Sequence, residues 1–169
     1  MDELVEKAKK NDIDAFTKLI LNIRKDLYCI AKTRINDEND IDDVIQETMI
    51  TAFLKLKKLR DNKLFKTWII KILINNCNKL YKKEKHKSLN DEEVQNKIEF
   101  FEIDLSGIEF NEFISFLNED ERTILTLYYY LGYTTKEISK ILNKSEGTIC
   151  SKISRSKTKI KNKYKGEFN

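Results

Sequence analysis

The sequence contains no proline and only four glycines among its 169 residues. Hairpins and tight reversals depend on the backbone angles that these two residues provide, so an all-β sandwich or barrel is not expected. Apolar residues make up 40% of the chain. That is enough for one medium domain or two small ones, and too much for a wholly disordered chain. We therefore predict an all-α fold.

Cysteine and histidine are also scarce. The three cysteines, Cys29, Cys77 and Cys150, lie far apart and form no C-x-x-C motif. Neither a disulfide framework nor a thiolate zinc site is indicated, and buried thiols in a reducing cytosol are expected. The single histidine, His86, lies in the basic run KKEKHK, where a surface position is expected. This argues against His-rich metal sites and against a histidine-based catalytic triad.

Long apolar runs are missing as well. The chain opens on the charged segment MDELVEKAKK, and no run of about 18 apolar residues occurs in it. Neither a signal peptide nor a membrane span is expected. We predict a cytoplasmic protein.

The charge is sorted along the chain, although the formal net charge is only +4. Residues 1–50 carry 8 basic and 12 acidic residues, whereas residues 51–87 carry 12 basic and 2 acidic ones. Residues 88–121 reverse the sign with 1 basic and 11 acidic residues, and residues 122–169 carry 11 basic and 3 acidic ones. Because solvated faces usually mix the two signs, this pattern suggests two surfaces for a polyanion joined by an anionic segment.

Apolar residues at helical spacing predict four helices in the N-terminal half. Two are expected within residues 1–30, with a break near Asn11. The third should run from about Asn39 to Leu59, and the fourth from about Leu64 to Lys83. The predicted apolar stripes are Ile41, Ile45, Thr48, Ala52, Leu56 and Leu59 in the third helix, and Phe65, Ile69, Ile72, Leu73 and Leu80 in the fourth.

The acidic segment 88–107 interrupts this pattern, since its large apolar residues show no sustained period. We predict that it links an N-terminal domain, residues 1–87, to a C-terminal domain, residues 108–169. Four short helices are expected in the second domain. The starts of three of them are marked by good N-cap residues, two of which are followed three positions later by Glu: Asn118 with Glu121, Thr134 with Glu137, and Ser145 alone.

Two of these helices, 135–142 and 146–163, are joined by only three residues, which is the spacing of a helix-turn-helix. One side of the pair can close a small core formed by Ile138, Ile141, Leu142, Ile149, Ile153 and Ile160. The other side of the second helix carries short hydroxyls and cations that suit base edges and phosphates, namely Thr148, Ser151, Lys152, Ser154, Arg155, Thr158 and Lys159. A solvated basic helix is the alternative, but the place of this helix in the motif and the scarcity of acids on that face favour DNA reading.

The side of helix 39–59 that faces away from its stripe carries Asp40, Asp43 and Glu47 beside Ile50 and Leu54. The carboxylates alone indicate a solvated face or favourable charge near a helix N-terminus. Apolar residues next to them suggest a docking patch for a basic, partly apolar partner. A divalent metal site is a further alternative, but no second carboxylate cluster or phosphate loop supports a nuclease. We expect no catalytic residue, no metal and no cofactor.

Helix 64–83 presents a second candidate surface for nucleic acid, because Asn can read base edges and Lys can hold phosphates. Its outer ridge comprises Lys71, Asn75, Asn78 and Lys82. A neutral surface role for either asparagine is the alternative. The preceding loop, with Asn62 and Lys63 at its tip, is placed to receive an unpaired base. Trp68 borders the apolar stripe, so a core position is expected for it rather than base stacking.

The C-terminal half contains four short motifs: a Leu-x-x-x-x-Arg opening at 117–122, Gly-Tyr-Thr at 132–134, Glu-Ile-Ser at 137–139 and Ser-x-Gly-Thr-Ile at 145–149. Through these motifs it resembles region 4 of bacterial sigma factors. The sequence departs from the family at Asn118, where Pro is usual, and at Cys150, where Lys or Arg is usual. Asn is a good N-cap, so the first change is harmless. The second removes a DNA-facing cation and bears on promoter preference.

The N-terminal half is similar to sigma region 2, through NDIDDVIQET at 39–48 and FKTWIIKILINNCNKLYKK at 65–83. The two motifs occur in the family's order with only a linker between them. That layout is typical of the extracytoplasmic-function group of the sigma-70 family.

The resemblance implies a transcription initiation factor whose partners are core RNA polymerase and promoter DNA. The acidic helix would dock on the clamp helices of the polymerase through Asp43, Gln46 and Glu47, with help from Ile50 and Leu54. The fourth helix and its preceding loop would capture the melted minus-ten element, and the last helix would read the minus-thirty-five element. An anti-sigma protein is a common partner in the family.

The same resemblance leaves the chemistry of transcription with the polymerase. We hypothesise that the acidic linker occupies a basic polymerase channel as a nucleic-acid mimic. The alternative function is a stand-alone helix-turn-helix regulator, which would not need the acidic-apolar face of helix 39–59.

Overall fold

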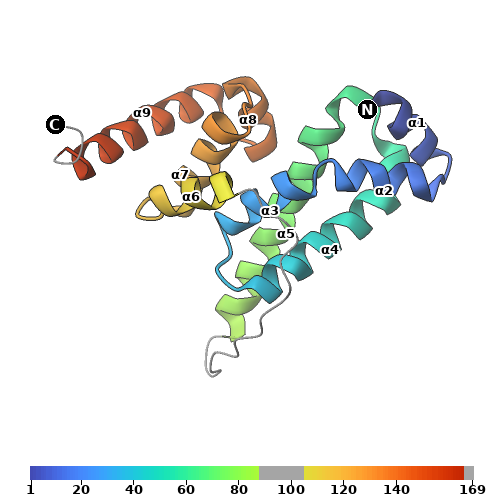
Figure 1. Ribbon diagram of the computed structural model, residues 1–169, viewed down its shortest axis with the longest axis horizontal. Helices are drawn as coiled ribbons and strands as arrows, with labels where there is room; N and C mark the ends of the chain where they lie inside the picture. Colours follow the sequence, from blue (N-terminus) through green and yellow to red (C-terminus); the bar gives the residue numbers. More distant parts are fainter. Residues whose placement is uncertain (88–104, 166–169) are drawn as a thin grey trace.

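The computed structural model describes residues 1–87 and 105–165, with side chains described for residues 1–80 and 109–165. Every element within these ranges is helical, as predicted. Figure 1 shows the N-terminal helices, coloured blue to green, grouped on one side and the C-terminal helices, coloured yellow to red, on the other. The predicted linker lies largely outside the described residues, and its last three positions belong to the first helix of the C-terminal half.

The N-terminal half contains α1 (Asp2–Lys9), α2 (Ile13–Leu21), α3 (Arg24–Lys32), α4 (Glu38–Lys55), the short 3-10 turns η1 (Leu56–Lys58) and η2 (Asn62–Leu64), and α5 (Phe65–Lys87). The predicted break near Asn11 is confirmed, and Asn11 adopts a positive φ of 68°. The prediction of two helices within residues 1–30 is wrong, because a second break separates α2 from α3. At this break Ile23 has φ −122° and ψ −9°, yet its side chain is fully buried. The apolar pattern therefore runs through the break and does not reveal it.

The core of the N-terminal half lies between α4 and α5, which pack against each other and against α3. All six residues of the stripe predicted for helix 39–59 are buried, although α4 itself ends at Lys55 and Leu59 follows η1. On α5, Phe65, Ile69 and Leu73 are buried, while Ile72 and Leu80 pack partly exposed against the same core. Trp68 also packs against the core, with its ring centroid 6.1 Å from that of Phe65, which confirms the position expected for it.

The C-terminal half contains α6 (Leu105–Phe113), α7 (Glu119–Leu125), a π-helical turn η3 (Thr126–Tyr130), α8 (Thr135–Leu142) and α9 (Glu146–Lys163). The four predicted helices are confirmed, and α8 and α9 have the predicted bounds. Capping boxes start α7 at Asn118 and α8 at Thr134, and the Ser145 hydroxyl accepts the Thr148 N–H at 3.1 Å. These local bonds satisfy N–H groups that the first helical turn leaves unpaired.

The helix-turn-helix is closed by the predicted apolar residues. Ile138, Ile141, Ile149 and Ile153 are buried, and α8 packs against α9. Asn143 ends α8 in the left-handed region with φ 52°, a conformation that Asn tolerates better than most residues. This reversal lets α9 leave at an angle to α8 with one long face exposed (Figure 1).

The two halves are in direct contact. α8 packs against α5, while α6 and the π-helical turn pack against α3. On α5, Ile70, Ile74 and Cys77 are buried although they lie outside the predicted stripe. α5 therefore has buried residues on more than the side that faces α4, as expected for a helix that also contacts α3 and α8.

Candidate functional site

The outer face of α4 combines acids with exposed apolar side chains. Asp43, Gln46 and Glu47 are exposed, whereas Asp40 is half-buried. Ile50 and Leu54 leave 50% and 73% of their surface exposed. Apolar side chains this exposed on a well-formed helix are not needed for the core and are free to contact a partner.

Phe53 extends this face of α4 and was missed in the sequence analysis. Its ring packs edge to face on Phe16 of α2 at 5.1 Å, yet the side chain remains 40% exposed. Its position between Ile50 and Leu54 in the helix was the available signal. Within the part of the chain that the structure describes, no group of three or more His, Cys, Asp or Glu side chains could hold a metal ion.

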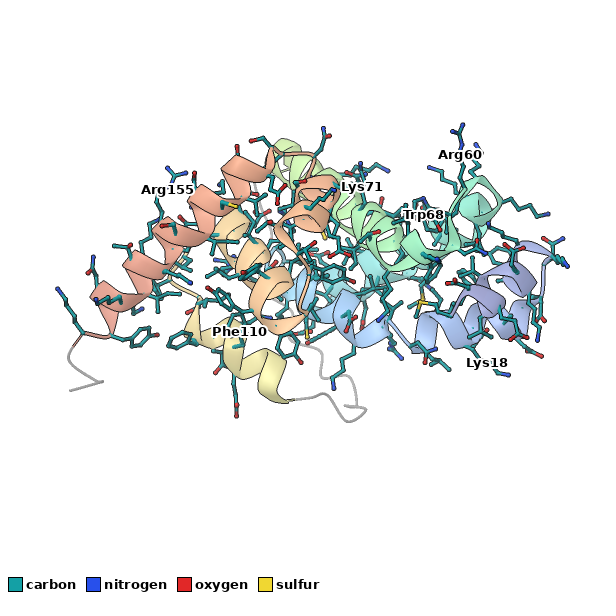
Figure 2. All side chains as sticks on the ribbon, turned by 90° about the horizontal axis from the view of Figure 1, so that it is seen from above. Lys18, Arg60, Trp68, Lys71, Phe110 and Arg155 are labelled. Carbon is teal, nitrogen blue, oxygen red and sulfur yellow. The ribbon has the colours of Figure 1, made fainter. Side chains whose placement is uncertain are left out.

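The ridge of α5 borders an open depression of about 370 Å³ between α4 and α5. Lys71 and Asn75 are exposed, and Figure 2 labels Lys71 and Trp68 on this helix. The depression is lined by Thr51, Lys55, Ile72, Asn75, Asn76, Asn78 and Lys79. Lys79 was missed, although it follows Asn75 by one helical turn. Lys82 and His86 lie outside the residues whose side chains are described.

Two of the predicted asparagines are already engaged within the protein. The Asn78 side-chain oxygen accepts a hydrogen bond from Arg34 Nη1 at 3.0 Å. The half-buried Asn62 accepts one from Lys9 Nζ at 2.5 Å and donates one to Glu6. The loop tip is therefore tied to α1. Of its two predicted residues, Asn62 is half-buried and Lys63 is exposed.

The outer face of α9 has fewer unpaired cations than the sequence suggests. Cys150, Ser151, Ser154 and Arg155 are exposed and line a shallow open depression. Figure 2 shows Arg155 on the outer side of this helix. The expectation that Cys150 is a buried thiol is wrong, because it lies on the face of α9 that points away from the core. Cys29 and Cys77 are buried as predicted, and burial raises the pKa of the Cys77 thiol to about 11.

Three other predicted residues of α9 contact neighbouring side chains, whereas the Thr158 hydroxyl donates to the Ser154 carbonyl oxygen at 3.3 Å. Thr148 is half-buried with its hydroxyl 2.8 Å from that of Ser145. Lys152 Nζ lies 3.3 Å from a carboxylate oxygen of Asp120, and Lys159 Nζ donates to both carboxylate oxygens of Glu121 at 2.7 and 3.0 Å. Both lysines therefore reach toward α7. Their role in DNA binding stays a prediction.

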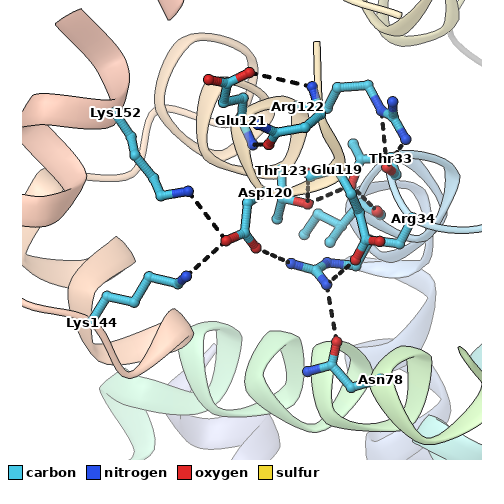
Figure 3. Close-up of polar contacts among 12 residues, drawn as sticks. Thr33, Arg34, Asn78, Glu119, Asp120, Glu121, Arg122, Thr123, Lys144 and Lys152 are labelled. Carbon is cyan, nitrogen blue, oxygen red and sulfur yellow. Dashed lines mark hydrogen bonds and ion pairs between the residues drawn. The ribbon is translucent and has the colours of Figure 1, made fainter. Parts of the chain in front are cut away.

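A charged cluster joins these surfaces, and sequence reasoning missed it (Figure 3). Arg34, which follows α3, has a side chain only 5% exposed and pairs with Glu119 and Asp120 at the start of α7. Asp120 also contacts Lys144 at 2.7 Å. Burial by itself raises the pKa of Asp120, but its contacts with Lys144 and Lys152 outweigh burial and lower this pKa overall.

Both halves of the chain are similar to known proteins. A family model described as Sigma-70 region 2 matches residues 19–87, and one described as Sigma-70, region 4, matches residues 109–160. The ECF RNA polymerase sigma-E factor of Haemophilus influenzae is 27% identical over 95% of this chain and 93% of its own. The RNA polymerase sigma-H factor of Pseudomonas aeruginosa is 28% identical over 94% of this chain and 90% of its own.

Solved structures show the same fold. CnrH, in its complex with the cytosolic domain of CnrY, matches with a TM-score of 0.70 and 21% identity over 95% of this chain and 94% of that one. The sigma factor RpoE of Bartonella quintana, in complex with the anti-sigma factor NepR, matches with a TM-score of 0.69 and 21% identity over 89% of this chain and 97% of that one. Among the described helices of the present chain, none is both long and apolar enough to cross a membrane. With both sigma regions matched in order and relatives aligned along nearly the whole length, the chain belongs to the sigma-70 family of RNA polymerase sigma factors and is of the extracytoplasmic-function type.

Proposed function

We propose that the chain binds core RNA polymerase through the outer face of α4 and directs the enzyme to promoters. The observation that carries this assignment is the exposure of Ile50 and Leu54 beside Asp43 and Glu47. Apolar side chains at the centre of an interface supply binding energy, and surrounding charges steer a basic partner. Gln46, also exposed, adds a polar contact at the edge of the same face.

The α5 ridge is the proposed surface for the melted minus-ten element. Lys71 and Asn75 are exposed there, next to the depression that Asn78 and Lys79 also line. Lysines can hold the backbone of an unpaired strand, while asparagines bond to base edges. Binding energy for unstacked bases offsets the cost of opening the duplex, so no catalytic residue is required.

The outer face of α9 is the proposed reader of the upstream element. Short side chains at Ser151 and Ser154 allow the helix backbone to approach the major groove, and Arg155 can reach a guanine with two hydrogen bonds. We propose residues 1–87 as the domain for polymerase docking and minus-ten binding, and residues 108–169 as the domain for the upstream element. Segment 88–107 would connect them.

An anti-sigma protein is a further proposed partner. The solved relatives CnrH and RpoE are each seen with a second protein, the cytosolic domain of CnrY and the anti-sigma factor NepR. A similar partner of this chain would restrain it by covering the α4 or α9 face.

The chemistry of RNA synthesis would remain with the polymerase. The chain would act where that enzyme acts, inside the cell.

Transcription from candidate promoters with purified core polymerase, with and without this chain, tests the proposal. Promoter-specific transcripts are expected only when the chain is present, and the chain should co-elute with the core enzyme in gel filtration. A chain that binds duplex DNA but neither core enzyme nor transcript start sites would instead be a stand-alone regulator.

A further inference from the structure

We propose that Glu146 and Gly147, at the start of α9, form a base-reading subsite. Gly147 leaves room for one base pair of the upstream element to approach the helix backbone, and the Glu146 carboxylate accepts a hydrogen bond from an exocyclic amino group of that pair. This inference rests on the proposed function of α9 as a reader of duplex DNA. Neither residue is among those predicted from the sequence to contact DNA.

Gly147 is a glycine that the fold of the described residues does not require. It lies within α9 and is exposed, and it lacks the positive φ that Gly132 adopts at 73°. A Cβ built on Gly147 would meet nothing within 4 Å beyond its chain neighbours and the backbone of its own helix. Glycine weakens a helix, because it loses more backbone freedom on folding than any other residue. Neither packing nor backbone geometry offsets that loss at this position.

A missing side chain on an exposed helix allows a second molecule to contact the backbone. Gly147 is the second residue of α9, and in a helix-turn-helix the N-terminal residues of the second helix contact base edges. Ser151 and Ser154 follow Gly147 at helical spacing and are also exposed. The backbone of α9 is therefore thinly covered along one line that begins at Gly147, on the face proposed to enter the major groove.

The Glu146 carboxylate is held in place beside this glycine. The Thr135 hydroxyl, at the start of α8, donates to Glu146 Oε1 at 2.6 Å, although the Glu146 side chain is exposed. The Ser145 hydroxyl fixes the same turn by accepting the Thr148 N–H at 3.1 Å. The bond from Thr135 engages one carboxylate oxygen, and a carboxylate can accept further bonds at its second oxygen. Glu146 is therefore positioned as an acceptor before DNA arrives.

A fixed carboxylate discriminates between bases in the major groove. Cytosine N4 and adenine N6 are amino donors there, whereas guanine O6 and thymine O4 are acceptors. The Glu146 carboxylate would bond to the amino groups and would be repelled by the two carbonyl oxygens, so the wrong base is actively disfavoured. DNA phosphates also repel a carboxylate, so Glu146 strengthens binding only where an amino group meets it. The subsite therefore selects cytosine or adenine at one position.

A wholly structural role for Glu146 is the alternative. A carboxylate in the first turn of a helix interacts favourably with the helix dipole, and the bond from Thr135 joins α8 to α9. That role predicts an effect on stability without an effect on base preference, and it gives no reason for a glycine at 147. Measuring base preference and Tm on the same variants therefore separates the two roles.

Gly147→Ala provides the first test. The methyl should raise the Tm of the free chain by about 2 °C, because alanine is the better helix former and the space around it is open. The same methyl should lower the affinity of the chain–core polymerase complex for its preferred duplex about tenfold, because it keeps the base pair from the backbone. Unchanged affinity, or a fall in Tm, would overturn the role assigned to Gly147.

The second test is enrichment of bound sequences from a library of random duplexes, with the chain in complex with core polymerase. The wild type should favour cytosine or adenine about tenfold over guanine and thymine at one position, and Glu146→Ala should abolish this preference there alone. Glu146→Gln identifies the base, because glutamine bonds to adenine. It should change a preference for cytosine into one for adenine, or keep a preference for adenine.

Glu112→Ala is the matched control, because Glu112 is an exposed glutamate of α6 and its loss changes the net charge equally. Its base preference should equal that of the wild type at every position. Base preference unchanged by Glu146→Ala would overturn the subsite. If the chain enriches sequences alone but not with core polymerase, the proposed initiation function is refuted and the same variants decide the subsite on the chain alone. Enrichment in neither form would refute both.

Discussion

Replacing Ile50 and Leu54 by Ala should weaken binding to core RNA polymerase by about 100-fold. Each substitution removes three carbons, and a buried methylene contributes about 0.8 kcal/mol. Scaled by the 50% and 73% of surface that these side chains leave for a partner to cover, the double substitution should remove about 3 kcal/mol of binding free energy. A difference of that size corresponds to about two orders of magnitude in Kd. Ala is a strong helix former, so α4 should stay folded.

The measurement is a titration of fluorescently labelled chain with core polymerase, at one salt concentration for all variants. Ile13→Ala is the matched control, because Ile13 is 67% exposed but lies on α2, away from the outer face of α4. Its Kd should stay within about twofold of the wild type, as for an ordinary surface change. The reasoning is refuted if the double variant binds as well as the wild type, or if the control loses as much affinity as the double variant.

Three further predictions concern the other surfaces. Arg155→Ala should reduce binding to the upstream element by about 1–3 kcal/mol and relax preference at one base pair, measured by competition with base-substituted duplexes. Asn75→Ala should leave that binding intact but lower strand opening, measured by permanganate reactivity of thymines near the start site, and a pre-melted bubble should restore transcription. Because the pKa of Asp120 is lowered in the folded state, its carboxylate stabilises the fold at pH values above the ordinary pKa of 3.8. This stabilisation is lost as the pH falls through the folded-state pKa. Asp120→Asn should therefore lower Tm at neutral pH but flatten its decline between about pH 5 and pH 2.

Each of these three predictions has an outcome that would contradict it. Equal weakening on every sequence would make Arg155 a phosphate contact, and unchanged binding would make α9 a solvated helix. Normal permanganate reactivity with Asn75→Ala would move the minus-ten assignment to the loop that carries Lys63. Identical acid dependence of Tm in the Asp120→Asn variant would show that its carboxylate does not stabilise the folded state.

Where local hydrogen bonds determine the end of a helix, the sequence predicted the helix bounds to the residue. The helix-turn-helix has the predicted bounds because Thr134 and Ser145 cap helices through bonds that reach only three residues. The stripe of α4 was also predictable, because one packed side of a helix repeats every 3.6 residues. The break at Ile23 was not, since a buried residue in the turn preserves the same apolar period across two helices.

By itself, then, the sequence determined the all-helical class, the main helices and the outward faces that carry Asp43, Leu54 and Arg155. Only the tertiary structure decided which polar side chains meet across the halves. Arg34 and Asp120 are 86 residues apart, and no periodicity links such positions. Their pairing depends on how the two halves pack, with α3 against α6 and the π-helical turn, and α5 against α8. Ile70 and Ile74 of α5 are buried outside the predicted stripe, which a single helix with one packed side would not explain. A helical wheel describes each helix alone. It therefore cannot show that a cation on its outer face forms an ion pair with a carboxylate of a neighbouring helix.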